Sequence, residues 1–202
     1  MTGQHAPLAA AFLDKDGTLI HDVPYNVDPN RIELMPGAAE GASRLVEAGY
    51  AIIVVSNQSG VSRGLFAEAA IADVERRIRE LLAGYGVPLA GFYYCTHHPQ
   101  GRVARYSIPC NCRKPKPGMI LRAARELSLD LSRSWLIGDI LDDVEAGHRA
   151  GCQTVFLDNG HETLWQWNSV RRPDVIVDDL SAAAKVIVTE PADVVIAREF
   201  IP

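Results

Sequence analysis

The chain has 202 residues, 48% of them hydrophobic and 22% charged, and its formal net charge is −5 at pH 7. Its length suits one domain with a substantial core, spanning residues 1–202, and its acidic balance excludes a protein that binds nucleic acid through a broad basic surface. No apolar run approaches the roughly 20 residues of a membrane span, and residues 1–11 lack the pattern of a signal peptide. We therefore expect a cytoplasmic monomer without membrane or nucleic-acid partners.

Apolar runs and helical patterns alternate along the chain. The runs predict strands at residues 8–13, 51–55, 91–95, 135–137, 154–157 and 175–177. Helices are predicted from Pro36-Gly37 to Gly49, over 67–85, from Pro117-Gly118 to Leu127, over 142–150 and over 181–188. In the third helix, the residues expected to face the core are Ile120, Leu121, Ala124 and Leu127. The alternation predicts an α/β fold with a doubly wound, mostly parallel sheet and no separate cap domain.

Polar side chains follow several of these segments. They are Asp14-Lys15-Asp16-Gly17-Thr18, Ser56-Asn57-Gln58-Ser59-Gly60, Arg113-Lys114-Pro115, and Gly138-Asp139 followed by Asp142-Asp143. One polar loop after a strand is ordinary in an α/β protein. Four loops that carry hydroxyl, amide, cationic and carboxylate groups at one edge of the sheet predict a binding site, because ligands of such sheets bind beyond the carboxyl ends of the strands.

The residue types favour phosphoryl transfer. Asp14 and Asp139, on neighbouring strands, offer hard oxygen ligands for Mg²⁺. Residues two apart in an extended segment point the same way, so Asp14 and Asp16 can both reach a substrate. One of them would attack phosphorus, and the other would protonate the leaving oxygen and then activate water. Ser56 and Lys114 would supply a hydroxyl donor and a fixed positive charge for the phosphoryl oxygens.

Cysteines cluster in the segment between the predicted strand at 91–95 and the helix after Pro117. Four cysteines in a reducing compartment indicate a metal site rather than a disulfide scaffold. The cluster consists of Cys95, Cys110 and Cys112, with His97 or His98 as a fourth ligand. This set suits tetrahedral Zn²⁺, and with four positions filled the zinc is expected to be structural, clipping a loop at about 95–112. Cys152 is interpreted as an ordinary core thiol.

Taken in order, four motifs resemble those of the haloacid-dehalogenase (HAD) superfamily of phosphohydrolases: Asp14-Lys15-Asp16-Gly17-Thr18, Ser56, Lys114, and Gly138-Asp139 followed by Asp143. The resemblance implies that Asp14 is the nucleophile, through an aspartyl-phosphate, and that Asp16 is the general acid and base. It also implies that Mg²⁺ is held by Asp14, Asp139 and the backbone carbonyl of Asp16, while Asp143 orients the metal's water molecules. Asp142 is interpreted as a solvated residue at the helix start.

The cysteine cluster narrows this resemblance. Tyr93-Tyr94-Cys95, the segment His97 to Gly101, and the segment Cys110 to Met119 resemble the family of D-glycero-D-manno-heptose 1,7-bisphosphate 7-phosphatases, which the chain matches over about residues 10–157. That family removes the 7-phosphate from its sugar bisphosphate, and it binds zinc through the first histidine of the pair, which favours His97. Histidinol-phosphate phosphatases are relatives with a similar zinc loop, so histidinol phosphate or another small sugar phosphate is the alternative substrate.

The same resemblance implies substrate contacts. They are Asp22 to Tyr25, the loop Ser56-Asn57-Gln58-Ser59, and the pair Arg113-Lys114. Arg63 is either a contact of the second phosphate or an exposed loop arginine. One departure concerns Ile140, since the related enzymes commonly carry lysine directly after Gly-Asp. The lost cation bears on how the distal phosphate is held or on which anomer is preferred. Residues 161–202 show no recognised resemblance to that family, and the tail at about 189–202 has no assigned role. Trp165 and Trp167 are interpreted as core or contact residues.

A non-catalytic phosphoacceptor module, such as a signalling receiver domain, is the alternative from another functional class. Asp16 argues against it, because a receiver needs no general acid two residues after its phosphoacceptor. The sequence therefore predicts a Mg²⁺-dependent phosphatase, an enzyme with an uncapped active site.

Overall fold

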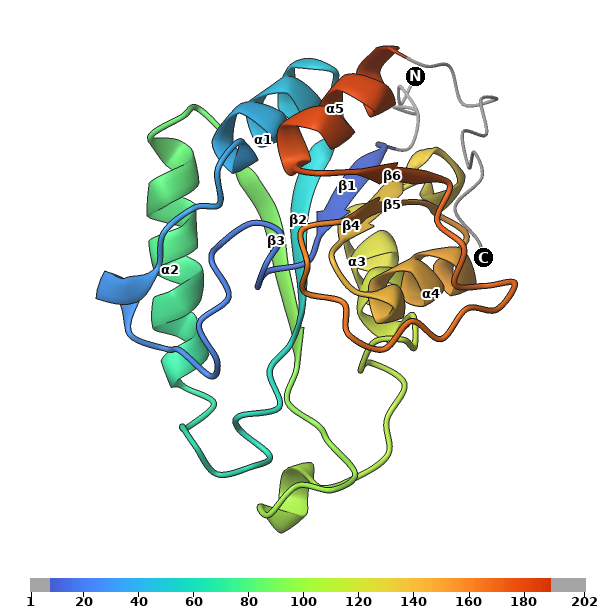
Figure 1. Ribbon diagram of the computed structural model, residues 1–202. Helices are drawn as coiled ribbons and strands as arrows, with labels where there is room; N and C mark the ends of the chain where they lie inside the picture. The colour runs from blue at the N-terminus through green and yellow to red at the C-terminus, as the bar shows by residue number, and fades with distance from the viewer. Residues whose placement is uncertain (1–7, 190–202) are drawn as a thin grey trace, which may run out of the picture.

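A computed structural model describes residues 8–189, and its centre is one parallel sheet (Figure 1). The strands are β1 (Ala10–Leu13), β2 (Ala51–Asn57), β3 (Leu89–Cys95), β4 (Trp135–Gly138), β5 (Gln153–Leu157) and β6 (Val175–Val177). Their order in the sheet is β3-β2-β1-β4-β5-β6, and each neighbouring pair is parallel. The predicted doubly wound α/β fold is confirmed.

Two layers of helices cover the sheet. They are α1 (Ala38–Glu47), α2 (Ala70–Ala83), α3 (Gly118–Leu127), α4 (Leu141–Ala150) and α5 (Leu180–Thr189). Alternate residues of β1 separate the layers: Ala11 and Leu13 belong to the core shared with α1, α2 and α5, whereas Ala10 and Phe12 belong to the core shared with α3 and α4. Both faces of β1 are buried because successive side chains of a strand point to opposite sides.

Helix α3 corrects one prediction. Met119, Ile120 and Ala123 are buried against the sheet, whereas Leu121 is 36% exposed. Around the helix axis Ala123 lies between Met119 and Ile120, so these three residues form one inward stripe and Leu121 lies outside it. The sequence pattern placed the stripe one position too far along, because Leu121 is more hydrophobic than Ala123.

The connections between elements contain little regular structure. Between β1 and α1 lies a 3₁₀ helix, η1 (Pro29–Arg31); between β3 and α3 lies another, η2 (Ala104–Tyr106); and η3 (Leu131–Arg133) precedes β4. Within residues 8–189, no helix is both long and apolar enough to cross a bilayer. Most of the predicted tail at about 189–202 lies outside the described residues.

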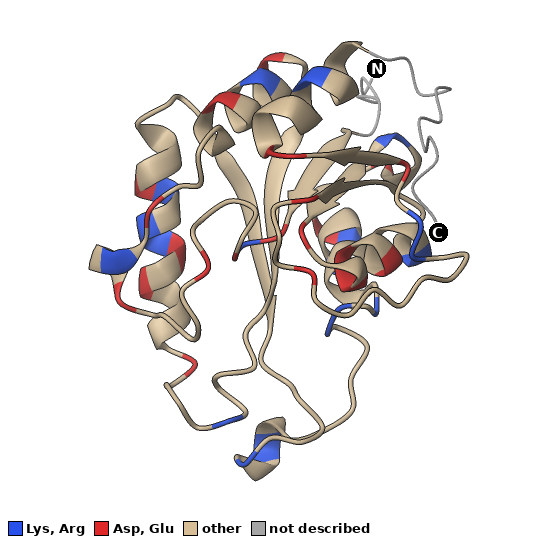
Figure 2. Cartoon of the chain, in the orientation of Figure 1, with Lys and Arg blue, Asp and Glu red and all other residues tan. Residues whose placement is uncertain are grey.

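The loops that leave the carboxyl ends of β1, β2, β4 and β5 converge at one edge of the sheet. Figure 2 shows acidic residues gathered where the central strands end. Because β1 pairs with both β2 and β4, the loop after β1 is the centre of this edge.

Candidate active site

Three carboxylates meet at the centre of this edge. Asp14 directly follows β1, and its backbone N–H donates to the carbonyl of Ile137 on β4 at 2.9 Å. Asp139 follows β4, and Asp143 lies in the first turn of α4. One oxygen atom of each of Asp14, Asp139 and Asp143 lies within 4.8 Å of the others, and all three side chains are buried. The predicted approach of Asp14 and Asp139 is thus observed, with Asp143 in the same group.

This carboxylate group fits a divalent cation. Burial and the neighbouring Asp14 carboxylate raise the pKa of Asp139 to about 8, and burial raises the pKa of Asp143 well above its usual value. Like charges this close disfavour ionisation unless a cation compensates them. Oxygen ligands of this kind suit Mg²⁺.

Lys114 supplies part of the compensating charge. Its Nζ forms ion pairs with the carboxylates of Asp14 and Asp143 and donates to the carbonyl of Val55 at 3.1 Å. Burial lowers the pKa of Lys114, but the two carboxylates outweigh this effect and raise the pKa above its usual value. The ammonium group is therefore a fixed positive charge beside Asp14, as the sequence analysis expected.

The loop after β2 forms the next wall. Asn57 Nδ2 donates to the backbone carbonyl of Lys114, and Asn57 Oδ1 accepts from the Lys114 N–H. Gln58 Nε2 donates to Ser56 Oγ at 2.7 Å. Ser56 and Gln58 are buried. Asn57 thus positions the lysine, a role that sequence reasoning had not assigned to this residue.

A cavity of about 260 Å³ lies between the loops that follow β1 and β2. Asp16 opens onto it, and burial raises the pKa of this carboxyl group, which favours a proton available for donation. The Asp16 carboxylate also forms an ion pair with Lys15. Five predicted contact residues line the cavity beside Asp16: Asp22, Tyr25, Asn57, Gln58 and Ser59.

Gly17 allows the loop after β1 to pack closely against Asp139 and His161. Its φ is +76°, and a Cβ atom there would lie 2.0 Å from Asp139 Oδ2 and 2.3 Å from His161 Nδ1. A residue with a side chain would therefore collide with the site and also adopt a backbone conformation that L residues rarely take.

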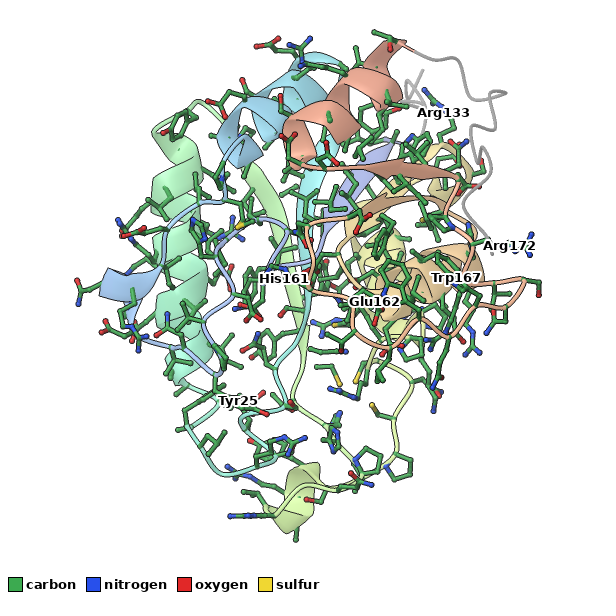
Figure 3. All side chains as sticks on the ribbon, viewed as in Figure 1. Tyr25, Arg133, His161, Glu162, Trp167 and Arg172 are labelled. Atoms are coloured by element: carbon green, nitrogen blue, oxygen red, sulfur yellow. The ribbon has the colours of Figure 1, made fainter. Side chains whose placement is uncertain are left out.

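The segment between β5 and β6 reaches the site, and sequence reasoning missed it. Asn159 Nδ2 donates to the carbonyl of Gly17 at 2.6 Å, and His161 Nδ1 lies 2.6 Å from Asp139 Oδ2. Glu162 Oε2 accepts from the backbone N–H of Leu141, at the start of α4, at 2.7 Å. Figure 3 labels His161 and Glu162 near the centre of the molecule. The sheet topology could have indicated this segment, because β5 is a parallel strand and the polar loop that follows it must also lie at this edge of the sheet.

Other residues of that segment pack against β5 and α4. Trp165 contacts Phe156 and Trp167 with ring centroids 5.6 and 5.4 Å apart. Trp165 is 46% exposed, so it is a contact residue rather than a core residue. Asp142 is paired with Arg171 at 2.7 Å, where the sequence analysis expected a solvated carboxylate.

Arg63 and Arg113 both act on His98. Burial and the positive charges of Arg113 and Arg63 lower the pKa of His98. Arg63 Nε and Arg113 Nη1 are buried atoms without a hydrogen-bond partner among residues 8–189. Neither arginine lines the cavity described above. Two unsatisfied guanidinium donors suit an anion.

The cysteine cluster is assembled at the start of the segment after β3. Cys95 Sγ lies 2.8 Å from Cys112 Sγ and 3.6 Å from Cys110 Sγ, and His97 Nδ1 lies 3.3 Å from Cys112 Sγ. His98 instead accepts from the backbone N–H of Gln100. The hydrogen bond with Cys95 lowers the pKa of Cys112 to about 5, so this thiol readily becomes a thiolate. Three thiols and an imidazole whose ligand atoms lie within 4.8 Å of one another form a donor set that suits tetrahedral Zn²⁺.

Comparison with known proteins identifies similar chains. The model of the HAD-hydrolase-like family matches residues 111–183. The D-glycero-beta-D-manno-heptose-1,7-bisphosphate 7-phosphatase of Yersinia pestis is 40% identical over 148 residues, which are 73% of this chain and 79% of that protein. The Escherichia coli K12 enzyme of the same name is also 40% identical, over 73% of this chain and 78% of its own length. The crystal structure of D,D-heptose 1,7-bisphosphate phosphatase from B. bronchiseptica, complexed with magnesium and phosphate, has a TM-score of 0.78 and 30% identity and covers 91% of this chain and all of that one.

Proposed function

The chain belongs to the HAD-like phosphatases, in the family of the D-glycero-beta-D-manno-heptose-1,7-bisphosphate 7-phosphatases, and on this basis we propose that it removes the 7-phosphate from D-glycero-D-manno-heptose 1,7-bisphosphate. The observation that carries the chemistry is the Lys114 ammonium between the carboxylates of Asp14 and Asp143, beside the cavity that Asp16 lines. A nucleophilic carboxylate needs such a cation to approach an anionic phosphate ester.

The proposed reaction has two steps. A carboxylate oxygen of Asp14 attacks phosphorus, the bond from phosphorus to the sugar oxygen breaks, and Asp16 gives its proton to that oxygen. Asp16, now a carboxylate, takes a proton from the water molecule that attacks the aspartyl-phosphate, and phosphate and free Asp14 are released. Burial, which raises the pKa of Asp16, supports its role as the acid of the first step.

Ser56 and Lys114 would contact the phosphoryl oxygens, as a hydroxyl donor and a positive charge. Asp14, Asp139 and the backbone carbonyl of Asp16 would hold Mg²⁺, with Asp143 beside them. The cation would supply positive charge where the anionic nucleophile meets the anionic substrate. The raised pKa values of Asp139 and Asp143 support this assignment, since both groups need a nearby cation to ionise fully.

We assign zinc to the cysteine cluster as a structural ion. Cys95, His97, Cys110 and Cys112 would fill its four positions, so none would remain for substrate. Because Arg113 and Lys114 directly follow Cys112 in the chain, the ion would also fix the start of the segment that delivers the lysine.

The sugar would occupy the cavity between the loops after β1 and β2. Its predicted contacts there are Asp22, Tyr25, Gln58 and Ser59, which all line the cavity. The unpartnered donors of Arg63 and Arg113 support a contact with the distal phosphate, a role that Ile140 cannot perform because it carries no charge. We expect a cytoplasmic monomer that acts on a soluble sugar phosphate.

A substrate panel tests the proposal. Phosphate release is measured with Mg²⁺ for both anomers of heptose 1,7-bisphosphate and for histidinol phosphate, and an Asp14→Asn protein purified in parallel reports contaminating phosphatase. We expect kcat/KM to be at least about tenfold higher for one heptose anomer than for histidinol phosphate, a difference of roughly 1.4 kcal/mol in transition-state binding. Equal or faster release from histidinol phosphate would instead assign the chain to that activity.

A further inference from the structure

His161 makes a short contact with a carboxylate of the site from outside the recognised motifs. Its Nδ1 lies 2.6 Å from Asp139 Oδ2. When Asp139 is ionised, as a metal ligand must be, its carboxylate only accepts hydrogen bonds, and Nδ1 of His161 is then the donor. The His161 side chain is 35% exposed, whereas that of Asp139 is 5% exposed. The imidazole therefore covers the carboxylate from the solvent side.

Asp139 has few other side-chain partners. Thr18 Oγ1 lies 3.4 Å from Asp139 Oδ1, at the long limit of a hydrogen bond. The His161 contact is much shorter and acts on the other oxygen. Of these two contacts, the imidazole is the stronger constraint on how the carboxylate is turned about its bond to Cβ.

The segment that carries His161 is fixed on both sides of the residue. Before it, Asn159 Nδ2 donates to the carbonyl of Gly17. After it, Glu162 accepts from the backbone of Leu141, and Arg171 pairs with Asp142 and Glu145 on α4. The absence of a side chain at Gly17 leaves the space in which the imidazole and the carboxylate meet. These contacts of the segment thus hold the imidazole in place.

We propose that His161 is a positioning residue that fixes the orientation of the Asp139 carboxylate for Mg²⁺. The inference rests on the proposed function, in which Asp139 is a metal ligand. Hydrogen bonds to a ligating carboxylate orient it and typically change metal affinity by about 10- to 100-fold when removed. The carboxylate oxygen has two lone pairs, so it can accept from His161 and bind the cation together.

The test measures Mg²⁺ binding without substrate. Mg²⁺ is added in steps, and its dissociation constant is obtained from the rise in the unfolding midpoint. The proteins are the wild type, His161→Leu, which removes the donor at similar size, His161→Asn, whose amide can donate from a similar place, and Arg171→Gln. The last variant loosens the same segment without touching Asp139, so it separates loss of the donor from loss of the segment's attachment.

We expect the dissociation constant to rise about tenfold in His161→Leu and to stay within about threefold of the wild type in His161→Asn and Arg171→Gln. A His161→Leu value within threefold of the wild type overturns the inference. So does an equal rise in Arg171→Gln, or a His161→Asn protein as weak as His161→Leu. If His161→Leu does not fold, His161→Ala is read by the same criteria. A wild type without any Mg²⁺-dependent rise refutes the proposed metal site itself, whereas a normal wild type with an unaffected His161→Leu refutes only this inference.

Discussion

Asn57 binds both backbone polar groups of Lys114, although the two residues are 57 positions apart in the chain. Its Oδ1 accepts from the Lys114 N–H at 3.0 Å, and its Nδ2 donates to the Lys114 carbonyl at 3.1 Å. The Nζ of the same lysine contacts Asp14 and donates to the carbonyl of Val55 on β2. The end of β2 thus holds both the backbone and the charged group of this residue.

Asn57→Ala is expected to lower kcat on the order of 10²-fold, because a displacement of about 1 Å in a catalytic group has that effect. The loss of two hydrogen bonds should also lower the free energy of unfolding by about 1–3 kcal/mol. Kinetics of phosphate release and urea unfolding measure the two effects. Asn30→Ala, at an exposed asparagine of η1, is the control. An Asn57→Ala protein with unchanged kcat would show that Lys114 is placed without this contact.

Asp14→Asn is expected to reduce turnover by at least about 10³-fold, since the amide is a poor nucleophile for phosphorus. The fold should be retained in EDTA, because the substitution removes a carboxylate that repels Asp139 and raises its pKa. Single-turnover phosphate release and the unfolding midpoint measure these outcomes. Asp73→Asn, on the exposed surface of α2, is the matched control. Substantial residual activity would exclude the aspartyl-phosphate route.

Cys112→Ser is expected to abolish zinc binding, which metal analysis would measure as a fall from about one zinc ion per chain. Activity should fall with it, since Arg113 and Lys114 begin directly after this ligand. Cys152→Ala is the control, because this buried thiol is not part of the cluster. A Cys112→Ser protein with full zinc content would show that Cys112 is not needed to hold the zinc ion.

Arg63→Gln is expected to raise KM for the heptose bisphosphate by about tenfold, the effect of losing roughly 1.4 kcal/mol of binding to the distal phosphate, and to leave KM for heptose 7-phosphate unchanged. Comparison of the two substrates isolates the second phosphate. Arg44→Gln, on an exposed position of α1, controls for a general change in charge. Equal effects on both substrates would contradict a contact with the distal group.

His148 provides a pH-dependent contribution to stability. Its Nε2 lies 3.0 Å from Asp174 Oδ2 and its Nδ1 lies 3.1 Å from the carbonyl of Val170, and the hydrogen bond to Asp174 raises the pKa of His148. A histidine with a raised folded-state pKa stabilises the fold most below its unfolded pKa of about 6.5, and this stabilisation is lost as the pH rises through the folded value.

Accordingly, His148→Gln should cost more free energy of unfolding at about pH 5.5 than at about pH 9. Urea unfolding of both proteins at the two pH values measures the difference. His21→Gln, at an exposed histidine, is the control. A cost that stays constant with pH would show that the charged form of His148 gains nothing from Asp174.

Sequence reasoning anticipated the parts of the site whose residue types are unusual for their place. Two aspartates after a buried apolar run indicate a phosphoryl-transfer site, and three cysteines with a histidine in one segment indicate a zinc site. It did not anticipate Asn57 as the partner of the lysine backbone, because an asparagine after a strand is common and its partner is distant in the chain. Helix α3 shows the same limit for packing, since contact with the sheet buries Ala123 and leaves the more hydrophobic Leu121 exposed.

A parallel α/β fold with a phosphoryl-transfer site could be predicted from the amino-acid sequence, because strand and helix periodicity and the order of the four motifs are visible along the chain. The contacts of Lys114 with Asp14 and Asp143, and of His161 with Asp139, are visible only in the folded molecule. These contacts join residues on different loops, and their geometry depends on the order of β1, β4 and β5 in the sheet. Strand order and twist bring such loops together, and no short stretch of sequence contains that information.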